Sequence, residues 1–461
     1  MRITSNNTAR LYVLRQKIIE FIRFDSNICS FFLSLFYLGE FFFAKITHNW
    51  PCALLAAGRL FRRTQFSYFR NLSTKILKSR ISHIGFSGVG DIFLKVCQQT
   101  SNIKELKRIS YDIQTGNTHM FDRRMLVLSP PQDCSKGVIL IKFTEYFKYV
   151  AQIFNFDLLC QKYIIVFEPS FSGYFDKDIL FLLNYKNPFI IQAPEPVDYE
   201  FIQTLNSNLY PVNIGANWWV DYNIFYPIPN MRKDFDLIVV SIWADFKRHF
   251  HLFEAMAIAK TKLRIALVGK PWPRQIDEIK MLARLYGVES QISFFENISQ
   301  NELNLLYNRS KSFLLLSKKE GINKAIIEAL FANLPIFLLE GFNYGYHYPY
   351  INSLTGSFIK RTDLPTFLIK LSQIIDKKKL APHQWVKSNM THEIATNRLC
   401  QVLQQIEIER EISINKKLAY KVNNPELDYF DSRVRQQLQP AYSSLKNYLA
   451  HRPAFDNCST Q

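Results

Sequence analysis

The sequence predicts an α/β protein that has two domains built on mostly parallel sheets, a basic, aromatic N-terminal extension and a helical C-terminal segment. Short runs rich in Ile, Val and Phe alternate with helical patterns over residues 82–227, and the alternation repeats more regularly over residues 234–377. This alternation favours parallel sheets, because a helix between two strands returns the chain to the starting edge. The predicted parts are the extension at 1–80, the first domain at 81–228, the second domain at 229–380 and the helical segment at 381–461.

Length and composition indicate a folded chain with large cores. The chain has 461 residues, of which 48% are hydrophobic, and its formal net charge is +18. This charge fits an anionic partner such as a membrane surface, a nucleotide or a nucleic acid, although a basic solvated surface explains it equally. The seven cysteines are odd in number and widely spaced, which disfavours a disulfide framework or a zinc site. Reduced thiols in a cytosol-like compartment fit best.

The N-terminal extension combines positive charge with aromatic residues. Residues 1–80 contain 13 Lys and Arg against three Asp and Glu. The apolar run 30–45 is interrupted by Glu40, and its uncharged parts are shorter than the roughly 18 residues of a simple spanning helix. Apolar residues and arginines then interleave, which is typical of an anionic membrane surface. The alternatives are a true transmembrane span and a buried core helix with surface arginines. We expect no signal peptide, because the first apolar run comes late and lacks a cleavage site.

Both predicted domains have strands that end in loops. In the first domain the strand patterns are 137–143, 163–169 and 188–196, and 177–185 is helix-like. In the second domain the predicted strands are 235–243, 263–270, 291–297, 311–317 and 334–340, with helices between them. Gly287 is predicted to end one helix, and Ser299 with Glu302 forms a capping box at the start of another.

The segment 317–336, SKKEGINKAIIEALFANLPI, holds two acidic residues on a predicted strand-loop-helix unit. Glu320 falls in the loop, at the strand end where α/β proteins bind ligands, and Glu328 falls two turns along the helix. Gly321 allows a close backbone approach, and the N–H groups of Ile322 and Asn323 start the helix, where they can hold an anion. Two glutamates at this spacing alone would equally fit a solvated helix face. We expect Asn333 to cap the helix in the left-handed conformation.

The pattern E-G-x6-E-A-L-x4-P in this segment resembles the nucleotide-sugar motif of retaining GT-B glycosyltransferases of the family 4, or group 1, type. Further resemblances follow in the family's order: the hinge phrase 219–227, the strand-loop-helix 241–255 with the phosphate-binding base, the strand 263–270, the helix 297–310 and the glycine loop 341–359. The resemblance covers about 219–359. It implies two Rossmann-like domains, with helix 389–411 as the crossover helix that returns to the first domain.

The resemblance implies roles for individual residues. Glu328 would accept hydrogen bonds from the donor's ribose hydroxyls, and Glu320 would bind hydroxyls of the transferred sugar. The N–H groups of Gly321, Ile322 and Asn323 would hold the sugar and phosphate. Lys247 corresponds to the phosphate lysine, which would stabilise charge on the departing pyrophosphate, so that no metal or other cofactor is needed.

The sequence departs from the family at one position. The family usually has an arginine five residues before the lysine, and Ile242 stands there. Arg248 is predicted to supply the second cation, unless it points to solvent. The family retains the anomeric configuration, and the departing phosphate is thought to take the acceptor's proton.

Three further motifs lie outside the segment 219–359. The glycine-rich run 84–91 loosely resembles a donor-facing loop, with an ordinary turn as the alternative. Residues 168–174 close a strand and could face the acceptor. Residues 176–178, DKD, mimic a metal-binding DxD motif, which this fold does not use.

The resemblance implies a nucleotide-sugar donor that transfers a hexose. The basic N-terminus favours a glycan or lipid-linked acceptor and a cytoplasmic protein on an anionic membrane face. The rival interpretations are a catalytically inactive GT-B scaffold, a nucleotide-sugar epimerase and a nucleic-acid binder. The last is disfavoured, because no nucleic-acid recognition motif occurs.

Overall fold

The computed structural model describes residues 6–22, 27–115, 124–317, 320, 322–340, 350–377, 379–423 and 427–450. The chain forms two compact units, which are described separately. Unit 1 consists of Met1–Ser26 and Val220–Thr391, and unit 2 consists of Asn27–Trp219 and His392–Gln461. The hinge phrase predicted at 219–227 contains the first change from unit 2 to unit 1.

Unit 1 is built on a six-stranded sheet in which every neighbouring pair is parallel. The strand order is β11-β10-β9-β6-β7-β8. The strands are β6 (Leu237–Val240), β7 (Ile265–Gly269), β8 (Ile292–Glu296), β9 (Phe313–Leu315), β10 (Ile336–Leu339) and β11 (Gly356–Ile359). The strands β6, β7 and β8 therefore follow one another from the centre of the sheet to one edge, and β9, β10 and β11 follow one another from the centre to the other edge.

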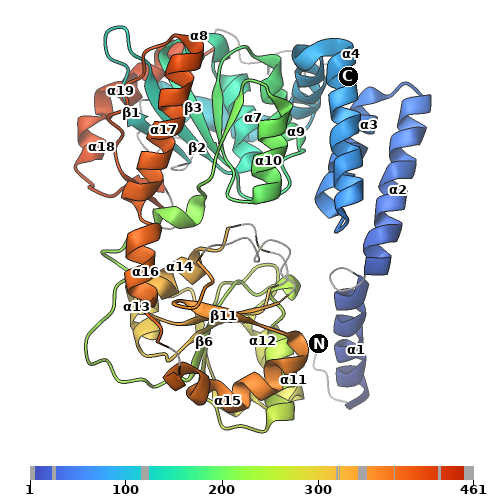
Figure 1. The fold of residues 1–461 in the computed structure, drawn as a ribbon, viewed down its shortest axis with the longest axis vertical. Helices are drawn as coiled ribbons and strands as arrows, with labels where there is room; N and C mark the ends of the chain where they lie inside the picture. Colours follow the sequence, from blue (N-terminus) through green and yellow to red (C-terminus); the bar gives the residue numbers. More distant parts are fainter. Residues whose placement is uncertain are drawn as a thin grey trace. The chain divides into compact units, whose positions relative to one another are not determined.

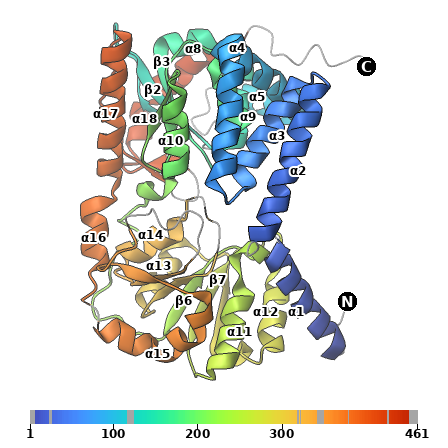
Figure 2. The ribbon, with the colours of Figure 1, turned by 45° about the vertical axis from the view of Figure 1, so that its right-hand side comes forward.

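Helices cover both faces of this sheet (Figure 1, Figure 2). The helices of unit 1 are α1 (Asn6–Glu20), α11 (His249–Ala259), α12 (Ile276–Leu285), α13 (Gln300–Asn308), α14 (Lys324–Phe331), α15 (Leu364–Lys377) and α16 (Pro382–Asn389). Alternate strand residues pack with α11, α12 and α15 into one core cluster. Short 3-10 turns are η4 (Asp245–Lys247), η5 (Glu289–Gln291) and η7 (Arg361–Asp363).

The predicted helix boundaries of unit 1 are confirmed where their caps are described. Ser299 and Glu302 form the capping box of α13. Gly287 has φ +69° after α12, and Asn333 has φ +59° after α14. A residue in the left-handed region turns the chain out of the helix and satisfies its last carbonyl groups.

Unit 2 contains a five-stranded sheet of order β1-β2-β3-β4-β5 (Figure 1). The strands are β1 (Met125–Ser129), β2 (Gly137–Lys142), β3 (Tyr163–Glu168), β4 (Phe189–Gln192) and β5 (Leu209–Val212), and only the β1–β2 pair is antiparallel. The connecting helices are α7 (Thr144–Ile153), α8 (Phe156–Lys162), α9 (Lys177–Leu180), η2 (Phe181–Asn184), α10 (Pro196–Leu205) and η3 (Ala216–Trp219). The α/β fold class with two parallel-sheet domains is thus confirmed.

Among the described residues, the helices that precede the sheet of unit 2 are α2 (Asn27–Ile46), α3 (Trp50–Arg63), α4 (Ser67–Gln99) and α5 (Ile103–Gln114). The glycine-rich run 84–91 lies within α4, where the chain turns between two helical stretches at Gly85, so the ordinary turn is confirmed there and the rest of the run is helical rather than a loop. Gly85 breaks the helix with φ +76°. Gly90 lets α4 approach η2 closely, because a Cβ at Gly90 would lie 2.0 Å from the backbone N of Asn184.

The C-terminal segment completes unit 2. The predicted crossover helix corresponds to α17 (His392–Arg410), where the chain re-enters this unit. The guanidinium of Arg398 donates to the carbonyl of Asn213 at 3.0 Å and lies 4.4 Å from the Trp218 ring. The hairpin β12 (Lys421–Asn423) and β13 (Leu427–Tyr429) follows, and then α18 (Val434–Gln437), α19 (Gln439–Ser444) and η8 (Leu445–Tyr448).

A fully buried ion pair joins this hairpin to the sheet. Lys421 Nζ lies 2.7 Å from a carboxylate oxygen of Glu168 at the end of β3, and Asn423 Nδ2 donates to the other oxygen at 3.1 Å. Burial raises the pKa of Glu168, but the charges of Lys421 and Lys142 and the hydrogen bonds from Lys421 and Asn423 lower it below its usual range. Glu168 is therefore ionised inside the protein.

We expect Glu168→Gln to destabilise unit 2 by about 3–5 kcal/mol, because Lys421 would remain buried without its counter-charge. Asp431→Asn, which breaks the exposed pair with Arg433, should cost less than about 1 kcal/mol. Urea denaturation of the two variants measures the difference. Equal effects would contradict the importance of the buried pair.

Candidate functional site

The strand order of unit 1 reverses between β6 and β9. In an open α/β sheet, ligands bind at the carboxyl ends of the strands at such a reversal, because the two following connections leave toward opposite sides. The loop after β6 leads through η4 to α11, and the loop after β9 leads to α14. Ser317, just after β9, has a buried hydroxyl oxygen for which no hydrogen-bond partner occurs among the described residues.

Lys247 and Glu320 meet at this reversal. Lys247 ends η4, whose turn is closed by a 3.0 Å hydrogen bond from its N–H to the carbonyl of Ala244. Its ammonium contacts the carboxylate of Glu320, although 73 positions separate the two residues. Each residue is only 8% exposed. The site thus holds a buried cation and a buried anion side by side.

Glu328 lies on the buried side of α14. Asn323 caps this helix by accepting a hydrogen bond from the N–H of Ile326 at 3.2 Å. One Glu328 oxygen accepts from the Tyr307 hydroxyl at 3.2 Å, and the other lies 3.6 Å from Lys324 Nζ. Burial and the Glu328 charge raise the pKa of Tyr307 well above its usual value, so the phenol stays protonated as a donor. Because Glu320 and Glu328 are both buried, the solvated helix face is excluded.

Arg248 follows Lys247 but has a different partner. Its φ of +59° starts α11, and its guanidinium contacts the carboxylate of Glu20 at the end of α1. His251 lies beside the same carboxylate, with 3.5 Å between Nε2 and Oε1. Arg248 is 3% exposed, so it does not point to solvent. Its role as the second cation stays a prediction.

The remaining predicted donor residues lie close to α14 or outside the described chain. Ile322 is half-buried before the helix, and Asn323 caps it. Gly321 lies outside the described residues, as do residues 341–349 of the predicted glycine loop.

Arg274 is a cation beside the site that sequence reasoning missed. Its backbone N–H donates to the carbonyl of Trp243 at 3.0 Å, and its Nε donates to Asp245 Oδ1 at 2.7 Å. It follows β7, in a stretch for which the resemblance assigns no role. Only the fold brings it to the loop that carries Lys247.

His249 contributes no charge at neutral pH. It is 3% exposed, and its Nε2 lies 2.9 Å from the hydroxyl of Ser241. Burial and the charges of Lys247 and Arg274 lower its pKa from 6.5 to about 3.

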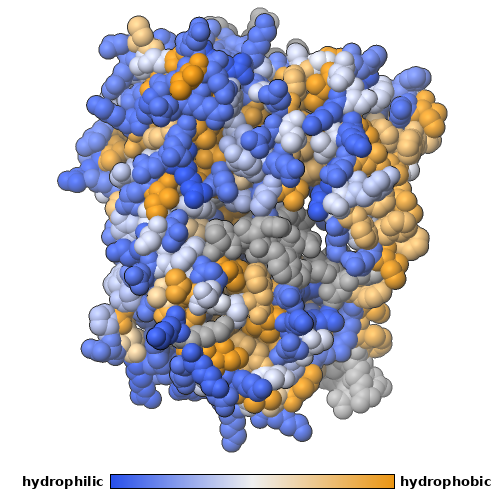
Figure 3. Space-filling view, viewed as in Figure 1, coloured by the Kyte–Doolittle hydropathy of each residue, from blue (hydrophilic) through white to orange (hydrophobic). Residues whose placement is uncertain are grey.

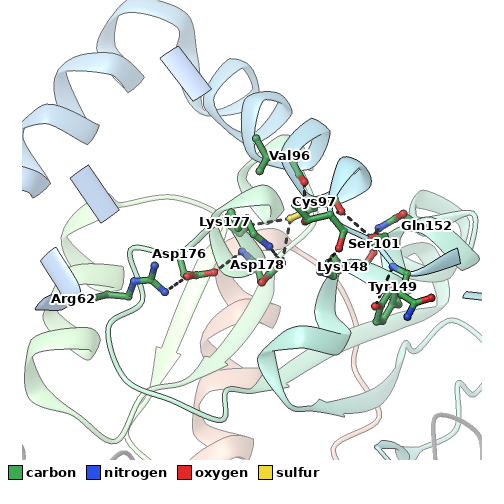
Figure 4. A network of polar contacts seen from close by, with 12 residues as sticks. Arg62, Val96, Cys97, Ser101, Lys148, Tyr149, Gln152, Asp176, Lys177 and Asp178 are labelled. Carbon is green, nitrogen blue, oxygen red and sulfur yellow. Dashed lines mark hydrogen bonds and ion pairs between the residues drawn. The ribbon is translucent and has the colours of Figure 1, made fainter. Parts of the chain in front are cut away.

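The motifs singled out in unit 2 have structural partners. Asp176 pairs with Arg62 of α3, and its carboxylate accepts from the N–H of Asp178 at the start of α9 (Figure 4). Asp178 lies 2.7 Å from Lys177 Nζ and accepts from the Cys97 thiol. DKD therefore fixes α3 and α4 against α9. In the described part of the chain, no group of three or more His, Cys, Asp or Glu could hold a metal ion.

The segment 168–174 is largely internal. Glu168 is held by the buried pair with Lys421. The N–H groups of Gly173 and Tyr174 both donate to Asp198 at 2.8 Å, and the Tyr174 hydroxyl donates to the carbonyl of Gln192 at 2.7 Å. These contacts explain the polar residues at this strand end without a ligand, and its role toward an acceptor stays a prediction.

Residues 227–389 match the family model described as glycosyl transferases group 1. This segment is therefore similar to the group 1 glycosyltransferases that the model describes. It contains the strand reversal and all the predicted catalytic and donor-binding residues, from Lys247 to Glu328. The resemblance to group 1 glycosyltransferases stated from the sequence is confirmed over these residues, and retention of the anomeric configuration stays a prediction.

Similar solved structures have low sequence identity. Sucrose-phosphate synthase from Thermosynechococcus elongatus is 14% identical over 59% of this chain and 73% of its own, with a TM-score of 0.44. The C-terminal domain of a group 1 glycosyl transferase from Francisella tularensis is 18% identical over 37% and 98%, with a TM-score of 0.33. Anabaena HepE in complex with UDP and glucose is 13% identical over 59% and 77%, with a TM-score of 0.43. Among curated proteins no relative matches the sequence.

We expect His249 to make the free energy of unfolding pH-dependent. Between pH 6.5 and about 3 the unfolded histidine is protonated and the folded one is not, so its contribution to stability is full above pH 6.5 and is lost as pH falls. The slope is at most ~1.4 kcal/mol per pH unit.

The variant His249→Gln keeps a hydrogen-bonding group near Ser241 but cannot titrate. Urea midpoints measured from pH 7.5 to 5 should fall less steeply in this variant than in the wild type. His48→Gln, which changes an exposed side chain, serves as the control. The same slope in wild type and His249→Gln would show that His249 does not cause the acid sensitivity.

Proposed function

We propose that this protein is a retaining, metal-independent glycosyltransferase that moves a hexose from a nucleotide-sugar to an acceptor. The observation that carries the proposal is the contact between Lys247 and Glu320 at the strand reversal of a group 1 glycosyltransferase domain. A buried cation beside a buried carboxylate matches a donor that has phosphate groups beside sugar hydroxyls.

The donor would be held by side chains of opposite charge. The ammonium of Lys247 would contact the diphosphate, and the carboxylate of Glu320 would accept hydrogen bonds from the sugar. Glu328 would accept from the ribose hydroxyls, in an orientation fixed by Tyr307. Arg248 and the N–H groups of Gly321, Ile322 and Asn323 complete the proposed contacts. Because these side chains are held in place before the donor binds, little free energy is lost in ordering them.

The proposed reaction needs no protein nucleophile. The bond between the sugar's anomeric carbon and the phosphate oxygen breaks, and negative charge develops on the departing nucleoside diphosphate. Lys247 stabilises this charge more strongly than the charge of the intact donor, which lowers the barrier. The acceptor's hydroxyl oxygen bonds to the anomeric carbon on the same face, and its proton passes to the departing phosphate.

We propose a glycan or lipid-linked acceptor and a location on the cytoplasmic face of a membrane. The positive charge of residues 1–80 supports this location. Helix α2 is long and apolar enough to cross a membrane by length and composition. Most of its large apolar side chains are exposed, as in a helix that contacts lipid, although Phe41 is buried.

A catalytically inactive scaffold that binds nucleotide-sugar is the alternative. Ile242 stands where the family has an arginine, and the guanidinium of Arg248 contacts Glu20. Both features reduce the positive charge offered to the diphosphate. Donor binding without transfer to any acceptor or to water would favour this alternative.

We expect Glu328→Gln to weaken donor binding by ~1.5–3 kcal/mol, or roughly 10- to 150-fold, because it removes charged hydrogen bonds to the ribose. Calorimetric titration with a panel of UDP-, GDP- and ADP-sugars measures the change. Glu289→Gln, an exposed glutamate of the same unit, should bind like the wild type. Failure of every nucleotide-sugar to bind the wild type would contradict the proposed donor site.

We expect Lys247→Met to lower kcat by about 10²- to 10³-fold with a smaller change in KM, because its charge acts mainly on the departing phosphate. Lys262→Met, an exposed lysine of the same unit, should be unaffected. Nuclear magnetic resonance of the product should show the donor's anomeric configuration. An inverted product would exclude the proposed mechanism.

A further inference from the structure

Helix α2 has an inverted distribution of side chains. Its buried positions are mostly small, and Ser34 donates a hydrogen bond to Thr64 at 2.9 Å. Its exposed positions carry large apolar side chains, among them Phe32 (63%), Phe36 (59%) and Phe43 (71%). Hydrophobic side chains gather over α2 at the right of the space-filling view (Figure 3). A helix that turns its largest apolar residues outward is suited to an apolar surrounding.

A groove of about 730 Å³ lies where α2 meets the start of α3 and the first half of α4. Its apolar lining residues are Leu38, Phe41, Phe42, Trp50, Leu72 and Ile76. This wall continues onto the exposed face of α2 through Phe42, which is 51% exposed. The groove therefore opens beside the apolar surface and offers room for a hydrocarbon chain.

The charged side chains that line the groove are cations. They are Lys45, Lys75 and Arg80, with Ser79, Ser82 and His83 as further polar lining, and none of its described lining residues is acidic. The Arg80 guanidinium lies 3.9 Å from the centre of the Trp50 ring, and its buried Nε has no hydrogen-bond partner among the described residues. No ion pair joins Lys45 or Lys75 to a carboxylate in the described part of unit 2. The groove thus presents a positive charge that the neighbouring side chains leave uncompensated.

We propose that this groove binds an anionic lipid of a bilayer on which α2 lies. The phosphate of the headgroup contacts Lys45, Lys75 and Arg80, and the hydrocarbon chain runs along Phe41, Phe42 and Ile76. The charge selects anionic over neutral headgroups, and the apolar wall distinguishes a lipid from a free phosphate or a nucleic acid. The inference concerns unit 2 and does not depend on the donor site in unit 1.

The first test compares the binding of the full-length protein to vesicles of phosphatidylcholine alone and of phosphatidylcholine with 30% phosphatidylglycerol. Wild type should bind the anionic vesicles at least tenfold more tightly. Lys45→Gln/Lys75→Gln should lose about 10- to 30-fold in affinity for these vesicles, following roughly fivefold per lysine near an anionic surface. Lys162→Gln/Lys186→Gln removes the same charge from exposed positions elsewhere in unit 2 and should lose less than threefold.

The second test separates a lipid from its headgroup. Dihexanoylphosphatidylglycerol, used below its micelle concentration, should bind the wild type, bind Lys45→Gln/Lys75→Gln at least tenfold more weakly and bind Phe42→Ser more weakly. Inorganic phosphate and oligothymidylate should not displace it at equal charge concentration. Circular dichroism of each variant checks that it is folded. If Lys45→Gln/Lys75→Gln is not folded, Lys45→Arg/Lys75→Arg, which keeps both positive charges, should still bind the lipid like the wild type.

Three results would overturn the proposal. These are an equal loss of affinity in both double-lysine variants, equal binding to neutral and anionic vesicles, or displacement of the lipid by phosphate or oligothymidylate. The first would indicate a diffuse charge effect. The last would indicate that the groove recognises the anion without the hydrocarbon chain.

Discussion

The reversal of strand order between β6 and β9 is the constraint on which the candidate site depends. A parallel sheet requires a crossover after every strand, and the crossovers that follow β6 and β9 build the sheet outward in opposite directions. The loops at these two strand ends therefore diverge and leave their residues facing one crevice. This topology brings Lys247 to Glu320. No local sequence preference could produce that contact.

Burying two charged side chains at the strand reversal costs free energy of folding. Moving a lysine and a glutamate out of water loses several kcal/mol of hydration per ion, and a buried pair recovers this only with good geometry and further hydrogen bonds. Stability alone therefore gives little reason for Lys247 and Glu320 to be buried together. A ligand that carries phosphate next to hydroxyl groups gives each charge an additional partner. Glu328 shows the same organisation, because Tyr307 and Lys324 orient its carboxylate before any ligand is present.

The sequence predicts what local patterns determine and fails where distant segments meet. The strands, the cap at Ser299 and the left-handed residue Asn333 follow from periodicity and short-range hydrogen bonding, and all are present. The run 84–91 looks like a loop because glycine is common in turns. Gly85 does break the helix there, whereas Gly90 is required for close packing against η2. The Arg248–Glu20 contact joins residues 228 positions apart, and Arg274 reaches the site only through the fold. Such pairings leave no periodic signal in the chain.

The two proposed binding sites differ in whether their charged side chains are paired within the protein. The donor site needs charges that are already paired and oriented, because its ligand must be held in one reactive geometry. The groove beside α2 needs charges that are left uncompensated next to an apolar surface, because a bilayer supplies both the counter-charge and the hydrocarbon. The outward-facing aromatic residues of α2 would be unfavourable in water, with a cost that grows with the apolar area exposed. Ser30 and Ser34 lie on its packed side, so these positions bury little apolar area inside the protein. In α11, by contrast, Leu252, Phe253 and Met256 face the core, although Ile258 is exposed. This contrast within one chain argues that α2 is adapted to an apolar surface outside the protein.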